Sequence, residues 1–327
     1  MLSEYDAWEH ICADAFDGKR GIVALLTAYF DAANDPTIKG KPDRPLIHSV
    51  GCYLGYHDDW RRFRREWLDE LRRHGVDKGR NEIRYFHMTD FEWSLSQVRN
   101  ENELPKDDFY YGWKLDEFLA FQKRLFRVLN RKRKDGYYRL AAFSSSVHKS
   151  EFDSQLPDDL KSDPECQSYY IFNAANVMKT IAFWCNRHFQ YYQRDPIHYI
   201  FAGGDGQGGN LENWFNHCWQ KESDRYYYRL HKGYTKMGYG IAWMEGEPAL
   251  QAADVATFEL SKVGVEVTVR GHSDIEMTEL RKSLPVLFHT SAFGFTLTGE
   301  QLAGAFDQIK LRRKSYPNDD SALLPPL

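Results

Sequence analysis

The chain has 327 residues, of which 42% are hydrophobic and 15% aromatic, so it can fill the core of a folded globular protein. Its formal net charge of −4 neither supports nor excludes nucleic acid as a partner, because binding needs only a local basic face. The five cysteines are widely spaced and include no C-x-x-C pair, which argues against a disulfide framework and against a thiolate zinc site.

The sequence carries no signal for a membrane or an oxidising compartment. Its first residues include acids and lack the basic-then-apolar order of a signal peptide. No apolar run approaches the roughly 18 residues that a membrane span needs, so we expect no membrane partner. With the cysteine pattern, this predicts reduced thiols and a cytoplasmic location. Apolar residues at helical spacing predict an N-terminal helical lead at residues 1–20.

The first predicted strand lies in the sequence GIVALLTAYFDAAND, at residues 21–35. Its apolar run suits a buried strand, and the acidic Asp31 closes it. Asn34, Asp35 and Pro36 favour a turn, so we expect the chain to leave the sheet just past Asp31 and to hold this carboxylate at a sheet edge. Asp31 then either binds a metal ion or tightens the turn through an Asx bond, and the strand alone does not decide between them.

Strand and helix patterns follow along the rest of the chain. They predict strands at 45–56, 83–86, 137–147, 196–202 and within 238–245, and helices at 58–75, 109–133, 166–192, 211–225, from 248 onward, at 276–284 and at 299–313. The short link between the first two strands favours an antiparallel pair. Residues 150–164 have the composition of an acidic loop. We expect residues 263–315 to form a C-terminal helical extension and residues 316–327 a loose tail.

The predicted helix at 58–75 carries five arginines largely off its apolar face. They are Arg61, Arg62, Arg65, Arg72 and Arg73. These side chains either follow a phosphate backbone or form a solvated helix face, and the second is more common because acidic residues are interleaved with them. Nucleic acid is therefore a candidate partner.

His87 and Asp90 lie three residues apart after the short strand predicted at 83–86. Such a pair can share a metal ion or a proton. A buried histidine bonded to a nearby carbonyl is equally ordinary, so the spacing alone is weak evidence for a site.

A second acidic residue follows the strand at 196–202. Asp205 stands within GGDGQGGN, whose glycines let the backbone pass close to a ligand. Neither GxxxxGK[ST] nor GxGxxG is present, so we reject a nucleotide-binding loop.

A third acidic residue lies on the helix that begins at Pro248. Gln251 and Asp254 are three residues apart and project in similar directions. Small apolar residues on the same helix let it lie close to a sheet, which makes an aspartate on its inner flank unusual.

Together these positions predict a carboxylate site. Asp31, Asp205 and Asp254 come together only if something offsets their repulsion, and Mg²⁺ or Mn²⁺ is the usual answer. Two such ions can activate a water and stabilise the leaving oxygen of a phosphodiester. His87, Asp90 or Glu247 would assist, as a further metal ligand or as a base.

Three short motifs resemble a known family in their order. FDAAN at 30–34 is similar to a strand end that reads Asp-Glu-Ser-Gly, LQAAD at 250–254 to a Leu-Gln-x-Ala-Asp helix, and FHMTD at 86–90 to a Phe-His-Met pattern of some members. The chain thus resembles the bacterial domain-of-unknown-function family 3800, which is placed among ribonuclease H-like folds. The resemblance covers roughly residues 21–262.

We therefore expect an α/β, ribonuclease H-like fold, with a mixed sheet flanked by helices at 21–262 and appended C-terminal helices. The expected function is metal-dependent phosphodiester hydrolysis, as in a nuclease. Ala32 and Ala202 stand where the family resemblance leads us to expect acids. The alternative is accordingly a catalytically degenerate binding or regulatory module that acts with a partner protein. DNA or RNA as substrate, and the oligomeric state, stay open.

Overall fold

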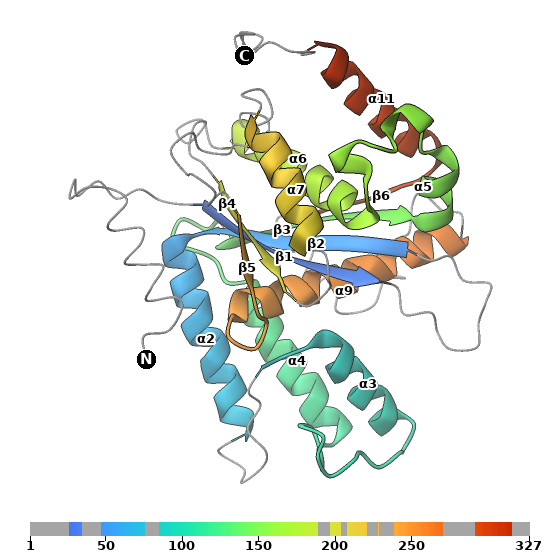
Figure 1. Ribbon diagram of the computed structural model, residues 1–327. Helices are drawn as coiled ribbons and strands as arrows, with labels where there is room; N and C mark the ends of the chain where they lie inside the picture. The colour runs from blue at the N-terminus through green and yellow to red at the C-terminus, as the bar shows by residue number, and fades with distance from the viewer. Residues whose placement is uncertain are drawn as a thin grey trace.

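The structure is a computed structural model with a mixed β-sheet between two layers of helices (Figure 1). It describes residues 26–34, 47–75, 85–188, 197–203, 208–220, 228, 239–270 and 292–315. The predicted α/β class is confirmed. None of the helices in these ranges is long and apolar enough to cross a membrane.

The described sheet has six strands in the order β5-β4-β1-β2-β3-β6. They are β1 (Leu26–Asn34), β2 (Ile47–Tyr56), β3 (Leu140–His148), β4 (Ile197–Ala202), β5 (Tyr239–Ala242) and β6 (Ala292–Leu297). The first three strands are antiparallel neighbours, which confirms the predicted pairing of the first two. On the other side of β1, β4 runs parallel to β1 and β5 parallel to β4.

Helices cover both faces of this sheet (Figure 1). They are α2 (His57–Gly75), α3 (Met88–Arg99), α4 (Leu115–Leu129), α5 (Lys149–Gln155), α6 (Tyr169–His188), α7 (Gly208–Gln220), α9 (Pro248–Arg270) and α11 (Gly299–Ser315), with 3-10 turns η2 (Asp158–Leu160) and η3 (Pro164–Cys166). Helices α2, α3, α4 and α9 share one apolar core with the sheet, and α6 and α7 share another on the opposite face. Both faces of β2 are therefore buried, which explains its nearly continuous apolar sequence.

Alternation along β1 decides which face Asp31 occupies. Tyr29 belongs to the core under α2 and α9, whereas Ala28 and Phe30 belong to the core under α6 and α7. Because successive side chains of a strand point to opposite faces, Asp31 lies on the same face as Tyr29, toward α9.

The first strand is longer at its C-terminal end than the sequence pattern predicts. Residues Asp31 to Asn34 continue the antiparallel ladder with β2, where Asp31 pairs with Gly51. Asp31 thus lies within a strand, and the expectation that the chain leaves the sheet just after it is wrong. The turn preference of Asn34 is overridden because pairing with β2 satisfies its backbone groups.

Other elements also differ from the sequence prediction. Residues 85–87 are irregular, and α3 begins directly after them. A strand was expected at 83–86, but residues 85 and 86, which the structure describes, do not belong to one. Residues 150–164 contain α5 and two 3-10 turns where a loop was expected. Helix α4 begins at Leu115, six residues after the predicted start at 109.

The expected C-terminal helical extension at 263–315 contributes a strand to the sheet. β6 runs parallel to β3 at the sheet edge, and α11 follows it. Helix α11 packs with α5 and the end of β3 in a third apolar cluster. The predicted lead at 1–20, the helix at 276–284 and the tail at 316–327 lie outside the described residues.

Helix α9 approaches the sheet very closely at Gly51. A Cβ on this glycine would lie 2.4 Å from Thr257 Oγ1 and 2.8 Å from Thr257 Cα. The Thr257 hydroxyl donates to the Ala253 carbonyl at 2.8 Å and also lies 3.2 Å from the Asp31 carbonyl. The glycine in β2 therefore lets α9 cross directly over β1 and β2, beside Asp31.

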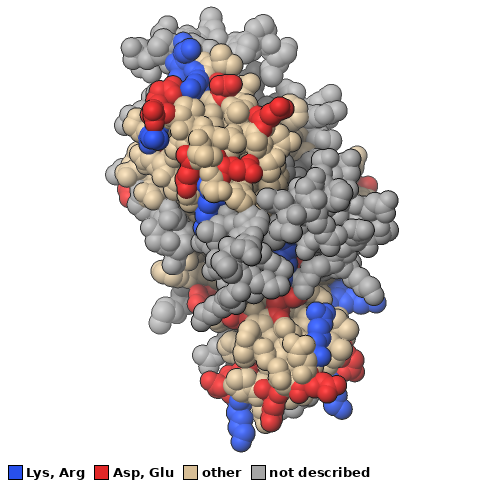
Figure 2. Space-filling view, turned by 90° about the vertical axis from the view of Figure 1, so that its right-hand side faces the viewer, with Lys and Arg blue, Asp and Glu red and all other residues tan. Residues whose placement is uncertain are grey.

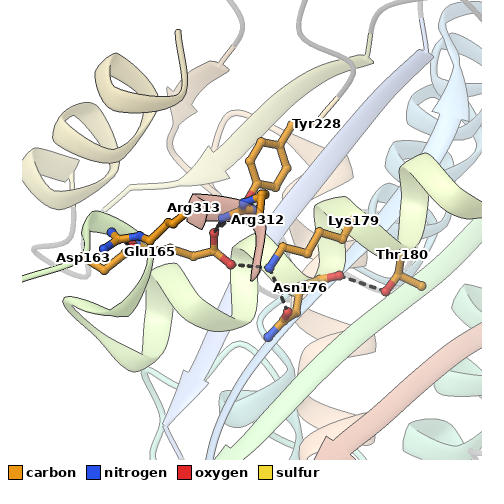
Figure 3. Close-up of polar contacts among 8 residues, drawn as sticks. All are labelled: Asp163, Glu165, Asn176, Lys179, Thr180, Tyr228, Arg312 and Arg313. Carbon is orange, nitrogen blue, oxygen red and sulfur yellow. Dashed lines mark hydrogen bonds and ion pairs between the residues drawn. The ribbon is translucent and has the colours of Figure 1, made fainter. Parts of the chain in front are cut away.

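A buried ion-pair network connects η3, α6 and α11 (Figure 3). Glu165 is only 2% exposed, and its carboxylate accepts bonds from Lys179 and Arg312 and from Tyr228 Oη at 2.9 Å. Burial opposes the ionisation of Glu165, but Lys179 and Arg312 outweigh it and lower its pKa to about 2. The network thus holds α11 against the sheet domain through a fully ionised carboxylate.

The close approach of α9 makes Gly51→Ala a sharp test. Since the new methyl group meets the backbone of Thr257, the helix must move, and we expect a loss of about 3 kcal/mol in unfolding free energy. The control is Gly304→Ala in α11, where nothing lies within 4 Å of an added Cβ, and where we expect a gain of up to about 1 kcal/mol. Urea unfolding of both variants measures these changes in unfolding free energy. Equal stabilities of the two variants would contradict the close packing of α9 on Gly51.

For the network of Figure 3, we expect Glu165→Gln to cost about 3 kcal/mol of stability at pH 7, because two partly buried cations, Lys179 and Arg312, lose their counter-charge. Asp159→Asn is the control; its exposed carboxylate pairs with Lys310 at 3.0 Å, and its loss should cost less than about 1 kcal/mol. The Glu165 contribution is present above pH 4.5 and is lost as the pH falls through about 2. Chemical denaturation at several pH values checks both the size and the direction.

Candidate functional site

Asp31 and Asp254 meet between the central strand and the helix that crosses it. Asp254 is 5% exposed and lies one turn before Thr257 on α9. The Asp31 carboxyl group lies within hydrogen-bonding reach of it. The fold thus brings two of the three aspartates predicted from the sequence into direct contact.

The irregular segment before α3 completes this group. The Met88 backbone N–H donates to Asp254 Oδ2 at 2.5 Å. His87 Nδ1 lies 3.1 Å from Asp90 Oδ2, and the His87 charge also interacts with Asp254 and Asp31. We refer to Asp31, His87, Asp90 and Asp254 as the His–Asp cluster.

Charge interactions hold His87 in its cationic form. The hydrogen bond to Asp90 raises the pKa of His87 to about 9, against the effect of burial, and the charges of Asp254 and Asp31 act in the same direction as Asp90. At neutral pH this histidine is therefore positively charged.

Asp254 is the member of the cluster whose ionised form is disfavoured by burial. Burial raises its pKa to about 6, although the His87 charge, the Met88 N–H and the hydrogen bond with Asp31 all lower it. Nearby Asp90 acts with burial to raise it. The cation and donors present do not fully offset the cost of a buried carboxylate, which is typical of sites that bind or transform a ligand.

Glu247, the predicted assisting acid, lies at the start of α9. Its Oε1 accepts from the Ala249 backbone N–H at 3.2 Å, and its Oε2 lies 3.9 Å from Arg64 Nη1. It is seven residues, or roughly 10 Å along the helix, from Asp254. These contacts are those of a helix cap that also joins α9 to α2.

The third predicted aspartate, Asp205, lies outside the described residues. β4 ends at Ala202, and its neighbour Phe201 pairs with Phe30, so this strand stops at the level of Asp31. Across the described ranges, no three His, Cys, Asp or Glu side chains are grouped so that they could hold a metal ion.

Two contributors to the site were not included in the sequence prediction. The first is the Met88 backbone amide, which no side-chain pattern reveals. The second is Gln251, whose three-residue spacing to Asp254 was the available signal. Its buried side-chain amide bonds to Trp67, to the Phe86 N–H and to the Met244 carbonyl.

The described surface does not single out a basic face for a nucleic acid. Acidic and basic side chains lie side by side at the lower end of the molecule in Figure 2. The loop between α3 and α4 carries exposed Glu101, Glu103 and Asp107. All five arginines predicted to lie off the apolar face of α2 are exposed, but Arg61 already pairs with Asp58 and Arg73 with Glu70.

Comparison with known proteins adds no relative to this description. No protein-family model matches the chain, and no match was found among curated proteins or solved structures. The resemblance expected from the three short motifs stays a prediction, and the function is argued from the geometry of the site.

The pair of His87 and Asp90 yields a pH prediction. Asp90→Asn removes the largest cause of the raised pKa of His87, so we expect that pKa to fall from about 9 toward 6.5. Since the folded-state pKa is the higher one, the stabilisation by the pair is complete below pH 6.5 and is lost as the pH rises through about 9. An NMR titration of the imidazole signals measures the shift.

His48 is the internal control for this titration. It is buried in β2, and burial, with a smaller effect of Lys149, lowers its pKa to about 4. It should be unaffected by Asp90→Asn. A His87 titration that does not move in the variant would contradict the assignment of Asp90 as its main partner.

Proposed function

We propose that the chain is a metal-dependent phosphodiesterase, a nuclease-like enzyme, with Asp31 and Asp254 at its centre. The observation that carries this proposal is the contact of these two carboxyl groups beside the buried Met88 amide. Two carboxyl groups this close repel when both are ionised, and a divalent cation with oxygen preference relieves that repulsion.

The sheet supports a ribonuclease H-like assignment. In that fold three antiparallel strands are followed by two strands parallel to the first, on its other side. Here β1, β2 and β3 are antiparallel, and β4 and β5 extend the sheet from β1 in parallel. β6, parallel to β3, is an addition at the far edge. Asp31 on the first strand then occupies the central position of the sheet.

Mg²⁺ and Mn²⁺ prefer carboxylate oxygens as ligands. Asp31 and Asp254 would hold the ion, and Asp205, from the glycine-rich segment after β4, would be the further ligand, because Asp90 pairs with His87 and the described residues form no group of three that could hold a metal ion. The bound ion would supply charge neutralisation at the phosphate and an activated water.

The charge of His87 favours one of its expected roles. With a pKa of about 9 it is protonated at neutral pH, so it can bind a phosphate oxygen or donate a proton to a leaving oxygen. A protonated imidazole has no lone pair for a proton, which disfavours action as a base.

A second candidate function is a binding or regulatory module of the same fold that needs no metal. Ala32 follows Asp31, and Ala202 ends β4, so two positions expected to be acidic carry no charge. His87 supplies a positive charge to the carboxyl groups without any metal. Nucleic-acid or protein binding that is unchanged by a chelator would favour this module.

The test of the enzyme proposal is calorimetric Mn²⁺ binding by the wild type, Asp31→Asn and Asp254→Asn at pH 8, above the pKa of Asp254. We expect wild-type binding and at least a tenfold loss of affinity in each variant, because the neutral amide oxygen of asparagine lacks the negative charge of the carboxylate that it replaces. Hydrolysis of labelled DNA and RNA with Mn²⁺ should fall in parallel.

Asp107→Asn is the matched control, since Asp107 is an exposed carboxylate in the loop before α4. It should bind Mn²⁺ like the wild type. Unchanged metal binding in both site variants, or no wild-type binding at millimolar Mn²⁺, would overturn the proposal.

A further inference from the structure

Gln251 joins helix α9 to three other segments from a fully buried position. Its Oε1 accepts from Trp67 Nε1 of α2 at 2.8 Å and from the Phe86 backbone N–H at 3.0 Å. Its Nε2 donates to the Met244 carbonyl at 3.0 Å. A buried amide that uses both ends in this way fixes the backbone that it contacts.

The bond to Phe86 acts directly on the candidate site. Phe86 precedes His87 and Met88, and the segment is extended at His87, with φ −130° and ψ 122°. The Phe86 N–H binds Gln251, and the Met88 N–H binds Asp254. The two amides, two residues apart, thus attach to two side chains one helical turn apart on α9.

This two-point attachment fixes the register of the segment against the helix. Two residues of extended chain span roughly 6.6 Å, and three residues of helix rise roughly 4.5 Å, so long side chains can join the two at both points. A slip by one residue would present the His87 N–H instead, and since side chains alternate along extended chain, the imidazole would point away from Asp254, with which its charge interacts.

We propose that Gln251 is a positioning residue for the His–Asp cluster, which holds the 86–88 segment in the register that places the Met88 amide and His87 beside Asp254. The inference about geometry stands on the hydrogen bonds alone. Its consequence for metal affinity rests on the proposed function.

Gln251 also stabilises the core, and this second role must be separated from the first. The bond from Trp67 joins α9 to α2 and touches no residue of the cluster. Trp67→Phe removes that donor and leaves the Phe86 bond in place. It is therefore the matched control for a purely structural effect of Gln251.

The experiment compares amide hydrogen exchange at Met88 in the wild type, Gln251→Met and Trp67→Phe. Methionine has a similar length but offers only a weak acceptor, so Phe86 loses its anchor. After correction for any change in global stability, we expect Met88 amide exchange to be at least tenfold faster in Gln251→Met than in the wild type. In Trp67→Phe we expect it to be less than twofold faster. If Gln251→Met does not fold, Gln251→Asn, which is one methylene too short to reach Phe86, replaces it.

Mn²⁺ affinity of the same proteins provides the second readout. We expect at least a tenfold loss in the Gln251 variant and no change in Trp67→Phe. Met88 protection equal to the wild type in the Gln251 variants, or an equal loss in Trp67→Phe, would overturn the positioning role. No Mn²⁺ binding by the wild type would instead overturn the proposed function, and the exchange result would still decide the role of Gln251.

Discussion

The candidate site depends on one packing contact, the crossing of α9 over β1 and β2 at Gly51. Because Gly51 has no side chain, Thr257 lies directly on the sheet and shares its hydroxyl between its own helix and the Asp31 carbonyl. Asp254, one helical turn away, is thereby brought next to the Asp31 side chain. A helix held several ångströms higher would separate Asp254 from Asp31 and expose the Asp254 carboxyl group to water.

Two buried carboxylates in this chain, Glu165 and Asp254, have opposite pKa shifts because their surroundings differ. Glu165 has Lys179, Arg312 and Tyr228 as partners, and its pKa falls to about 2. Asp254 has a backbone amide, a nearby imidazolium and a second carboxyl group, and its pKa rises to about 6. The first carboxylate is satisfied and fastens α11, whereas the second lacks sufficient positive charge. That deficit is what a divalent cation would supply.

The sequence predicted the α/β class and most elements because long apolar runs and amphipathic helices are local signals. It also indicated Asp31 and Asp254 as candidate site residues, since an acid on a buried strand or on a small-residue helix breaks the local pattern. It did not predict β6, whose partner β3 is distant in sequence, or the extension of β1 past Asp31, which follows from the ladder with β2. The Met88 amide and the Gln251 bonds depend on irregular chain crossing a helix, which no periodicity encodes.

The central claim is that Asp31 and Asp254 together form a metal-binding centre. The most direct measurement is a crystal structure of the full chain grown with Mn²⁺, with the ion located by its anomalous scattering. The account predicts a manganese peak bound by carboxylate oxygens of both Asp31 and Asp254. An ordered site without manganese, in which the two carboxyl groups still share a hydrogen bond at millimolar Mn²⁺, would contradict it.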